Sequence, residues 1–74
     1  MTDLKQKRKE NGYTQRELAV RSGLSIRTLQ YYEQGVLDIN KASAQVVFRL
    51  ALALGCKMED LLTFPAFYVD HADE

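Results

Sequence analysis

Residues 14–35 have the sequence TQRELAVRSGLSIRTLQYYEQG, which predicts two short helices joined by a tight corner. Thr14 and Glu17 match a capping box, in which the threonine accepts a hydrogen bond from the amide three residues on and the glutamate reaches back. Ser25 is suited to cap the second helix, and Gly23 supplies the positive φ that the corner needs. The stretch therefore predicts a helix-turn-helix.

The chain on either side continues the helical pattern. We expect a first helix over residues 3–11, a fourth over 41–54 with Asn40 as its cap, and a short last helix over 58–63. Glycines follow the helical runs, where left-handed residues commonly end helices. No stretch alternates apolar and polar residues for long enough to indicate a strand. The expected fold class is all-α.

Length and composition exclude several classes of function. The 74 residues suffice for one domain. One cysteine and one histidine exclude an intrachain disulfide and a Cys/His zinc site, and we expect Cys56 to be a small buried hydrophobe. No Ser/His/Asp set, carboxylate pair or glycine-rich phosphate loop is present, so we expect no enzyme, metal, cofactor or small-molecule ligand. The longest apolar run, residues 50–54, is too short to cross a membrane. Since no signal-peptide pattern is seen either, we expect a cytoplasmic protein.

Charge is unevenly distributed along the chain, although the net charge is zero. Residues 1–49 carry nine Lys or Arg against five Asp or Glu, whereas residues 50–74 carry one against five. A basic front and an acidic back suit a protein that meets a polyanion with one side. The alternative is an ordinary fluctuation of surface charge.

A helical wheel over residues 25–34 separates an inner from an outer face. At 100° per residue, Leu29 and Tyr32 point inward. The outer face and its flank carry the candidate DNA contacts, which are Ile26, Arg27, Gln30, Tyr31 and Gln34. In a helix-turn-helix the start of the second helix enters the major groove, and an arginine there can bond both acceptors of a guanine. We therefore expect Arg27 to read a base, with a phosphate contact or a solvated charge as alternatives.

The neighbours of Arg27 have weaker assignments. Ile26 is placed to pack on a thymine methyl group, and Gln30 or Tyr31 to reach an adjacent base or phosphate. For all three, an ordinary structural role is the alternative.

Three motifs within residues 3–63 resemble those of a known family. They are TQRELA at 14–19, YEQG at 32–35 and LALALG at 50–55, and the family is the Cro/C1-type (XRE-like) helix-turn-helix family. The resemblance implies a compact five-helix, lambda-repressor-like domain that binds operator DNA, usually as a dimer, in a transcriptional repressor or regulator. The sequence departs from this family in two respects. The span before the third motif is longer than in the shortest phage repressors, and the sequence contains no ligand-sensing domain.

The resemblance also implies roles for individual residues. It implies that Gln15 clamps the DNA backbone and braces the reading helix. The remaining backbone candidates are Thr14, Ser25, Gln34 and Lys41. It pairs Arg8 with Glu33 in a structural salt bridge, so neither is expected to contact DNA.

The chain divides, on this interpretation, into a DNA-binding domain over residues 1–63 and an aromatic, acidic tail over 64–74. The apolar side chains outside the expected core are Phe48, Leu52, Phe64, Phe67 and Tyr68. They predict one of two arrangements. Either the tail folds back onto its own domain, or these side chains form the seam, that is, the contact surface, of a homodimer that binds double-stranded DNA. The competing function is an antitoxin or adaptor that uses the same fold to bind a partner protein.

Overall fold

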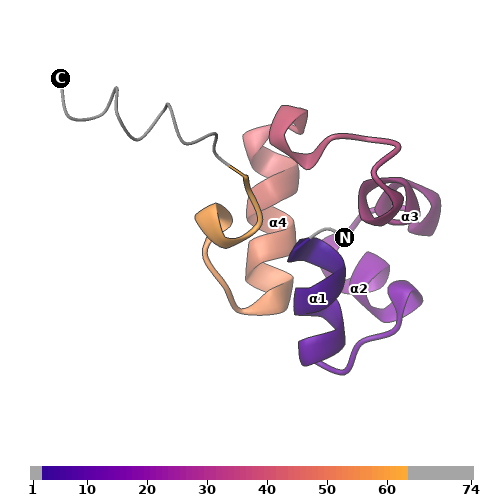
Figure 1. The fold of residues 1–74 in the computed structure, drawn as a ribbon. Helices are drawn as coiled ribbons and strands as arrows, with labels where there is room; N and C mark the ends of the chain where they lie inside the picture. Colours follow the sequence, from indigo (N-terminus) through magenta and orange to yellow (C-terminus); the bar gives the residue numbers. More distant parts are fainter. Residues whose placement is uncertain (1–2, 64–74) are drawn as a thin grey trace, which may run out of the picture.

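The computed structural model of the chain describes residues 3–63, which form a bundle of helices (Figure 1). The elements are α1 (Asp3–Glu10), α2 (Gln15–Ser22), α3 (Ile26–Gln34), the 3-10 turn η1 (Ile39–Lys41), α4 (Ala44–Leu54) and the 3-10 turn η2 (Met58–Asp60). The described part contains no strand, so the all-α class is confirmed.

The predicted helix-turn-helix follows from its capping residues. The Thr14 hydroxyl accepts from the Glu17 amide at 3.1 Å, and the Thr14 amide donates to the Glu17 carboxylate at 2.9 Å, which completes the capping box. Ser25 caps α3 by accepting from the Thr28 amide at 3.1 Å. Gly23 ends α2 with a φ of 74°, in the left-handed region that favours glycine. These local bonds set the corner between α2 and α3.

The expectation that a helix would start at Lys41 under an Asn40 cap is wrong. Asn40 and Lys41 belong to η1, because the Asp38 side chain accepts from the Asn40 amide at 2.9 Å and caps that turn. Ala42 is then extended, and Ser43 caps α4 by accepting from the Val46 amide at 3.2 Å. Two capping residues five positions apart thus start two separate elements.

The five-helix count is also wrong for the part of the chain between residues 3 and 63, which has four α-helices. The helix expected over 58–63 is the single turn η2, which ends at Asp60. The proposed boundary at residue 63 stays a prediction, because residues 64–74 lie outside the described range.

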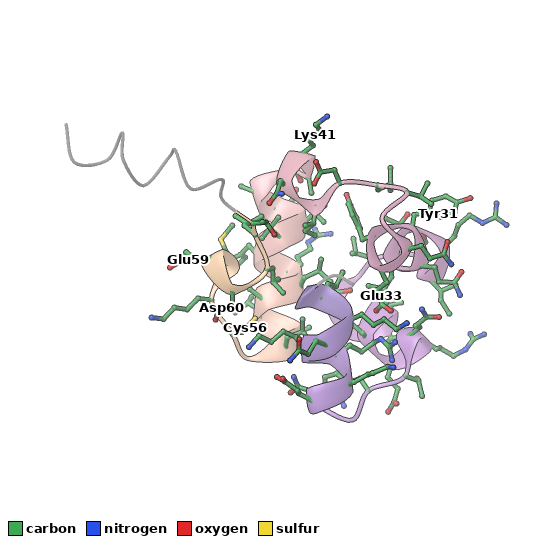
Figure 2. The ribbon with its side chains drawn as sticks, in the orientation of Figure 1. Tyr31, Glu33, Lys41, Cys56, Glu59 and Asp60 are labelled. Atoms are coloured by element: carbon green, nitrogen blue, oxygen red, sulfur yellow. The ribbon has the colours of Figure 1, made fainter. Side chains whose placement is uncertain are left out.

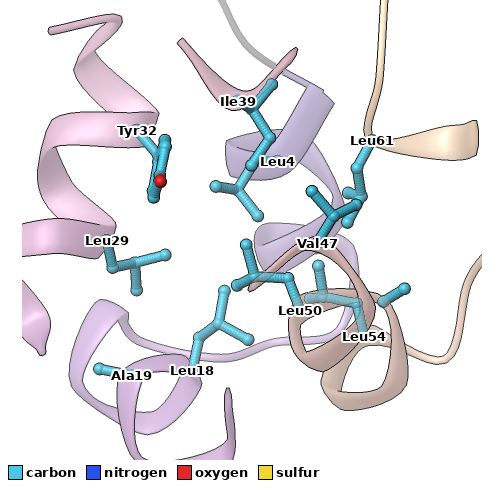
Figure 3. Packing of buried hydrophobic residues seen from close by; sticks show 11 residues of the cluster. Leu4, Leu18, Ala19, Leu29, Tyr32, Ile39, Val47, Leu50, Leu54 and Leu61 are labelled. Carbon is cyan, nitrogen blue, oxygen red and sulfur yellow. The ribbon is translucent and has the colours of Figure 1, made fainter. Parts of the chain in front are cut away.

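The core lies where the helices meet (Figure 3). Leu18 of α2, Leu29 of α3 and Leu50 of α4 are fully buried there. Val47, Leu50, Ala51 and Leu54 of α4 are also buried, at helical spacing. Tyr32 is also buried, and Leu24 packs against the cluster while partly exposed.

The helices pack so that α3 is held at one side of the bundle (Figure 1). α4 packs against α2, α2 against α3, α1 against α3, and η2 against α4. The Asn11 side chain donates to the Leu54 carbonyl at 3.2 Å, which joins the ends of α1 and α4. The Thr63 amide donates to the Asn40 side chain at 2.8 Å, which fixes the end of the described chain beside η1.

Candidate nucleic-acid interface

The outer face of α3 carries most of the residues that the sequence predicted as DNA contacts. Arg27 and Gln34 are exposed, and Tyr31 is 38% exposed. Arg27 and Tyr31 are four residues apart and therefore share one side of the helix. A cation and an aromatic hydroxyl stand together on this face, and both can donate to bases or phosphates.

Ile26 and Gln30 are less accessible than their neighbours. Ile26 is half-buried and packs against the core cluster, so part of its side chain has a structural role. Gln30 is half-buried, and its amide nitrogen donates to the Gln15 side-chain oxygen at 3.1 Å. The structure thus brings Gln15, at the start of α2, directly against α3.

Arg8 and Glu33 form a buried ion pair between α1 and α3. The guanidinium donates to both carboxylate oxygens, at 2.7 and 3.0 Å, and also to the Tyr13 carbonyl at 2.9 Å. Glu33 is 7% exposed. Its carboxylate also accepts from the Gln15 amide nitrogen at 3.1 Å. The salt bridge that the resemblance implied is therefore present, and Gln15 extends it toward the outer face.

The two hydroxyl side chains predicted to contact the DNA backbone already have local partners. The Thr14 hydroxyl accepts from the Glu17 amide, as described above. The Ser25 hydroxyl accepts from the Thr28 amide and donates to the Thr28 hydroxyl at 2.8 Å. Both are exposed at the start of a helix, where backbone amides and the helix dipole favour an anion.

Comparison with protein families matches residues 4–61 to the model of the helix-turn-helix family of the Cro/C1 type. This match covers more than half of the chain. The chain belongs to the Cro/C1-type helix-turn-helix family. The family is one of DNA-binding regulatory domains. Comparison with curated proteins and with solved structures gives no match.

In this member of the Cro/C1-type family, Lys41 lies at the end of η1 and is exposed. It stands well apart from Glu33 in Figure 2, at the end of the segment that links α3 to α4. Lys41 is therefore a candidate backbone contact that lies in the loop between α3 and α4, whereas the sequence analysis placed it at the start of a helix.

The side of the molecule away from α3 is acidic and apolar. Figure 2 shows Glu59 and Asp60 across the molecule from Tyr31.

Partial burial raises the pKa of the Cys56 thiol, and the nearby Asp60 carboxylate raises it further. Cys56 is half-buried against the core and not fully buried as predicted. Its raised pKa favours the neutral thiol, which packs as a small hydrophobe.

Two apolar side chains of α4 point away from the core. Phe48 is 51% exposed and Leu52 is 66% exposed. With Cys56 and Met58 they border a cavity of about 370 Å³ between α4 and η2. The other residues predicted for a dimer seam, Phe64, Phe67 and Tyr68, lie outside the described residues.

Residues 3–63 contain no group of three His, Cys, Asp or Glu side chains suited to a metal ion. In the same range, no helix is long and apolar enough to cross a membrane.

The chain of hydrogen bonds from Arg8 through Glu33 and Gln15 to Gln30 was predicted only in part, because the resemblance implied the Arg8–Glu33 pair and a bracing role for Gln15 but not the bonds from Gln15 to Glu33 and from Gln30 to Gln15. Its links join residues 25, 18 and 15 positions apart. No helical periodicity connects residues at such separations, because they lie on different helices.

Proposed function

We propose that this protein binds specific sequences of double-stranded DNA as a small transcriptional regulator, and that it acts as a repressor. α3 would enter the major groove with its N-terminal end foremost. A regulator must share a compartment with its DNA, and we place this one in the cytoplasm. Its action would be binding and not catalysis.

The observation that carries this proposal is the exposure of Arg27 on the first turn of α3, beside Tyr31. An arginine at that point of a helix-turn-helix can donate two hydrogen bonds to the O6 and N7 acceptors of a guanine. Ile26 would contribute only its exposed part, against a thymine methyl group. Tyr31 would reach a neighbouring base or phosphate.

The contacts to the DNA backbone would come from the margins of α3. Gln15 lies at the start of α2, where the helix dipole favours a phosphate. Thr14 and Ser25 precede the two helices of the motif, Gln34 lies at the end of α3, and Lys41 follows in η1. Such contacts position the protein and carry little sequence information.

We further propose that the protein binds DNA as a homodimer. One helix-turn-helix reads few base pairs, and two-fold symmetric half-sites about 34 Å apart would place two copies of α3 in successive major grooves. The exposed Phe48 and Leu52 on α4 support a seam on the side of the bundle away from α3.

A second function is favoured by the same two side chains. An antitoxin or adaptor would use the exposed apolar part of α4 to bind a different protein. Such a protein would need no exposed cation on α3, and for this reason we prefer the DNA-binding proposal.

Selection from a randomised duplex library, followed by titration of the preferred site, tests the proposal. Arg27→Ala should cost about 1–3 kcal/mol on that site and flatten the preference at one base pair. Lys41→Ala should weaken all sequences alike and reduce the slope of log affinity against log salt by about 0.9. An equal loss on every sequence for Arg27→Ala would make Arg27 a phosphate contact. If the wild-type chain binds no duplex, the DNA-binding proposal is wrong and the protein-binding alternative is favoured.

A further inference from the structure

The hydrogen bonds between α1, α2 and α3 are all donated toward the Glu33 carboxylate. Arg8 donates to Glu33, Gln15 donates to Glu33 at 3.1 Å, and Gln30 donates to Gln15 at 3.1 Å. The first link is buried and the last reaches the outer face of α3. The chain of bonds therefore connects an internal charge to a side chain at the proposed interface.

The carboxylate of Glu33 sets this direction, because an ionised carboxylate can only accept hydrogen bonds. Gln15 must then present its amide nitrogen to Glu33, and its oxygen faces Gln30. Gln30 in turn must present its nitrogen to Gln15. Rotating the Gln15 amide by 180° would place its oxygen against the Glu33 carboxylate. Rotating the Gln30 amide would place its oxygen against that of Gln15.

The orientation of the Gln30 amide is thereby determined. One hydrogen of its nitrogen is used by Gln15, which leaves the second hydrogen and the carbonyl oxygen of the same amide. Adenine presents an N6 donor and an N7 acceptor in the major groove, and it matches this pair of groups. Guanine presents two acceptors, O6 and N7, and would set an oxygen against the Gln30 carbonyl.

We propose that Gln30 recognises adenine in the base pair next to the one read by Arg27, and that Glu33 and Gln15 are positioning residues for its amide. Gln30 and Arg27 are three residues apart, so they lie side by side along the helix. This inference rests on the proposed DNA-binding function and deepens it, since it assigns a base to a side chain whose partners are inside the protein.

Base preferences of full-length variants, measured by selection and by titration of single-base variants of the preferred site, test the inference. Gln30→Ala should reduce the preference for adenine at one position by about tenfold or more, with unchanged preferences elsewhere. Gln15→Met, which removes the acceptor while keeping the length of the side chain, should weaken the same preference. The double variant should lose no more of it than Gln30→Ala does, because both changes remove one unit. Gln34→Ala is the matched control, an exposed glutamine of α3 that should leave this preference intact.

Three outcomes would overturn the inference, and they are distinguishable. If Gln30→Ala leaves every base preference unchanged while the wild type selects a site, Gln30 does not read a base and the proposed function stands. If Gln30→Ala removes the preference and Gln15→Met does not, Gln15 does not orient the amide. If the wild type enriches no sequence, the proposed function fails together with this inference. Thermal melting of each variant identifies any loss of fold.

Discussion

Glu33 illustrates how one residue can serve both the fold and the site. Its carboxylate is buried, yet it accepts from Arg8 on one side and from Gln15 on the other. No buried side-chain nitrogen or oxygen among residues 3–63 is left without a hydrogen-bond partner. A buried ion pair of this kind adds little net stability, but the loss of one member leaves the other charge uncompensated.

Arg8→Ala should therefore lower the free energy of unfolding by about 3–5 kcal/mol. That loss is a large share of the roughly 5–15 kcal/mol typical of folded proteins. Urea denaturation followed by circular dichroism measures it. Lys7→Ala is the matched control in the same helix, because Lys7 lies 3.9 Å from Glu10 in an exposed pair that should contribute at most about 1 kcal/mol. Wild-type stability for Arg8→Ala would contradict the structural role of the pair.

At the scale of the element, the start of α2 depends on a titratable cap. The hydrogen bond from the Thr14 backbone amide, together with the adjacent Thr14 hydroxyl, holds the pKa of the exposed Glu17 carboxyl below its ordinary value of 4.5. Because the pKa is lower in the folded chain, the ionised cap stabilises the folded state at neutral pH. This stability is fully present above the unfolded pKa and is lost as the pH falls through the folded pKa.

Glu17→Gln should accordingly melt at a lower temperature than the wild type at pH 7, and the difference should shrink below pH 4.5. Melting curves from pH 7 to pH 3 measure this convergence. Glu10→Gln, at another exposed carboxylate, is the control for general effects of charge. A difference in melting temperature that stays constant with pH would show that the Glu17 cap does not titrate as described.

The whole molecule has two unlike sides. α3 and its one cation, Arg27, face one way, and the exposed Phe48 and Leu52 of α4 belong to a different surface. This separation would allow two copies to join through α4 while both keep α3 available for DNA.

Leu52→Lys should shift the intact chain from dimer to monomer in sedimentation experiments. The change occurs once in each copy of a two-fold interface, so dimerisation should weaken by about 3 kcal/mol or more. Val20→Lys is the control, because Val20 is 77% exposed and lies on α2. A wild-type chain that is monomeric at high concentration would rule out the seam. Equal effects of the two variants would show that the α4 surface is not the dimer interface.

Features set by neighbours in the sequence were predictable. Thr14, Glu17 and Ser25 act within three residues along the chain, and the capping bonds form as expected. The inward positions of Leu29 and Tyr32 follow from helical periodicity. The start of α4 was missed because Asp38 and Ser43 are both good capping residues, and the chain uses each of them for its own element.

By itself, then, the sequence determined the all-α class, the helix-turn-helix and the outward position of Arg27, because each depends on hydrogen bonds and periodicity within a single helix or turn. Only the tertiary structure decided that Gln15 bonds both Glu33 and Gln30, and that the Thr63 amide reaches Asn40. These contacts depend on how helices and loops distant in the sequence pack together. Geometry of that kind arises from the shared core, and no local pattern of residues encodes it.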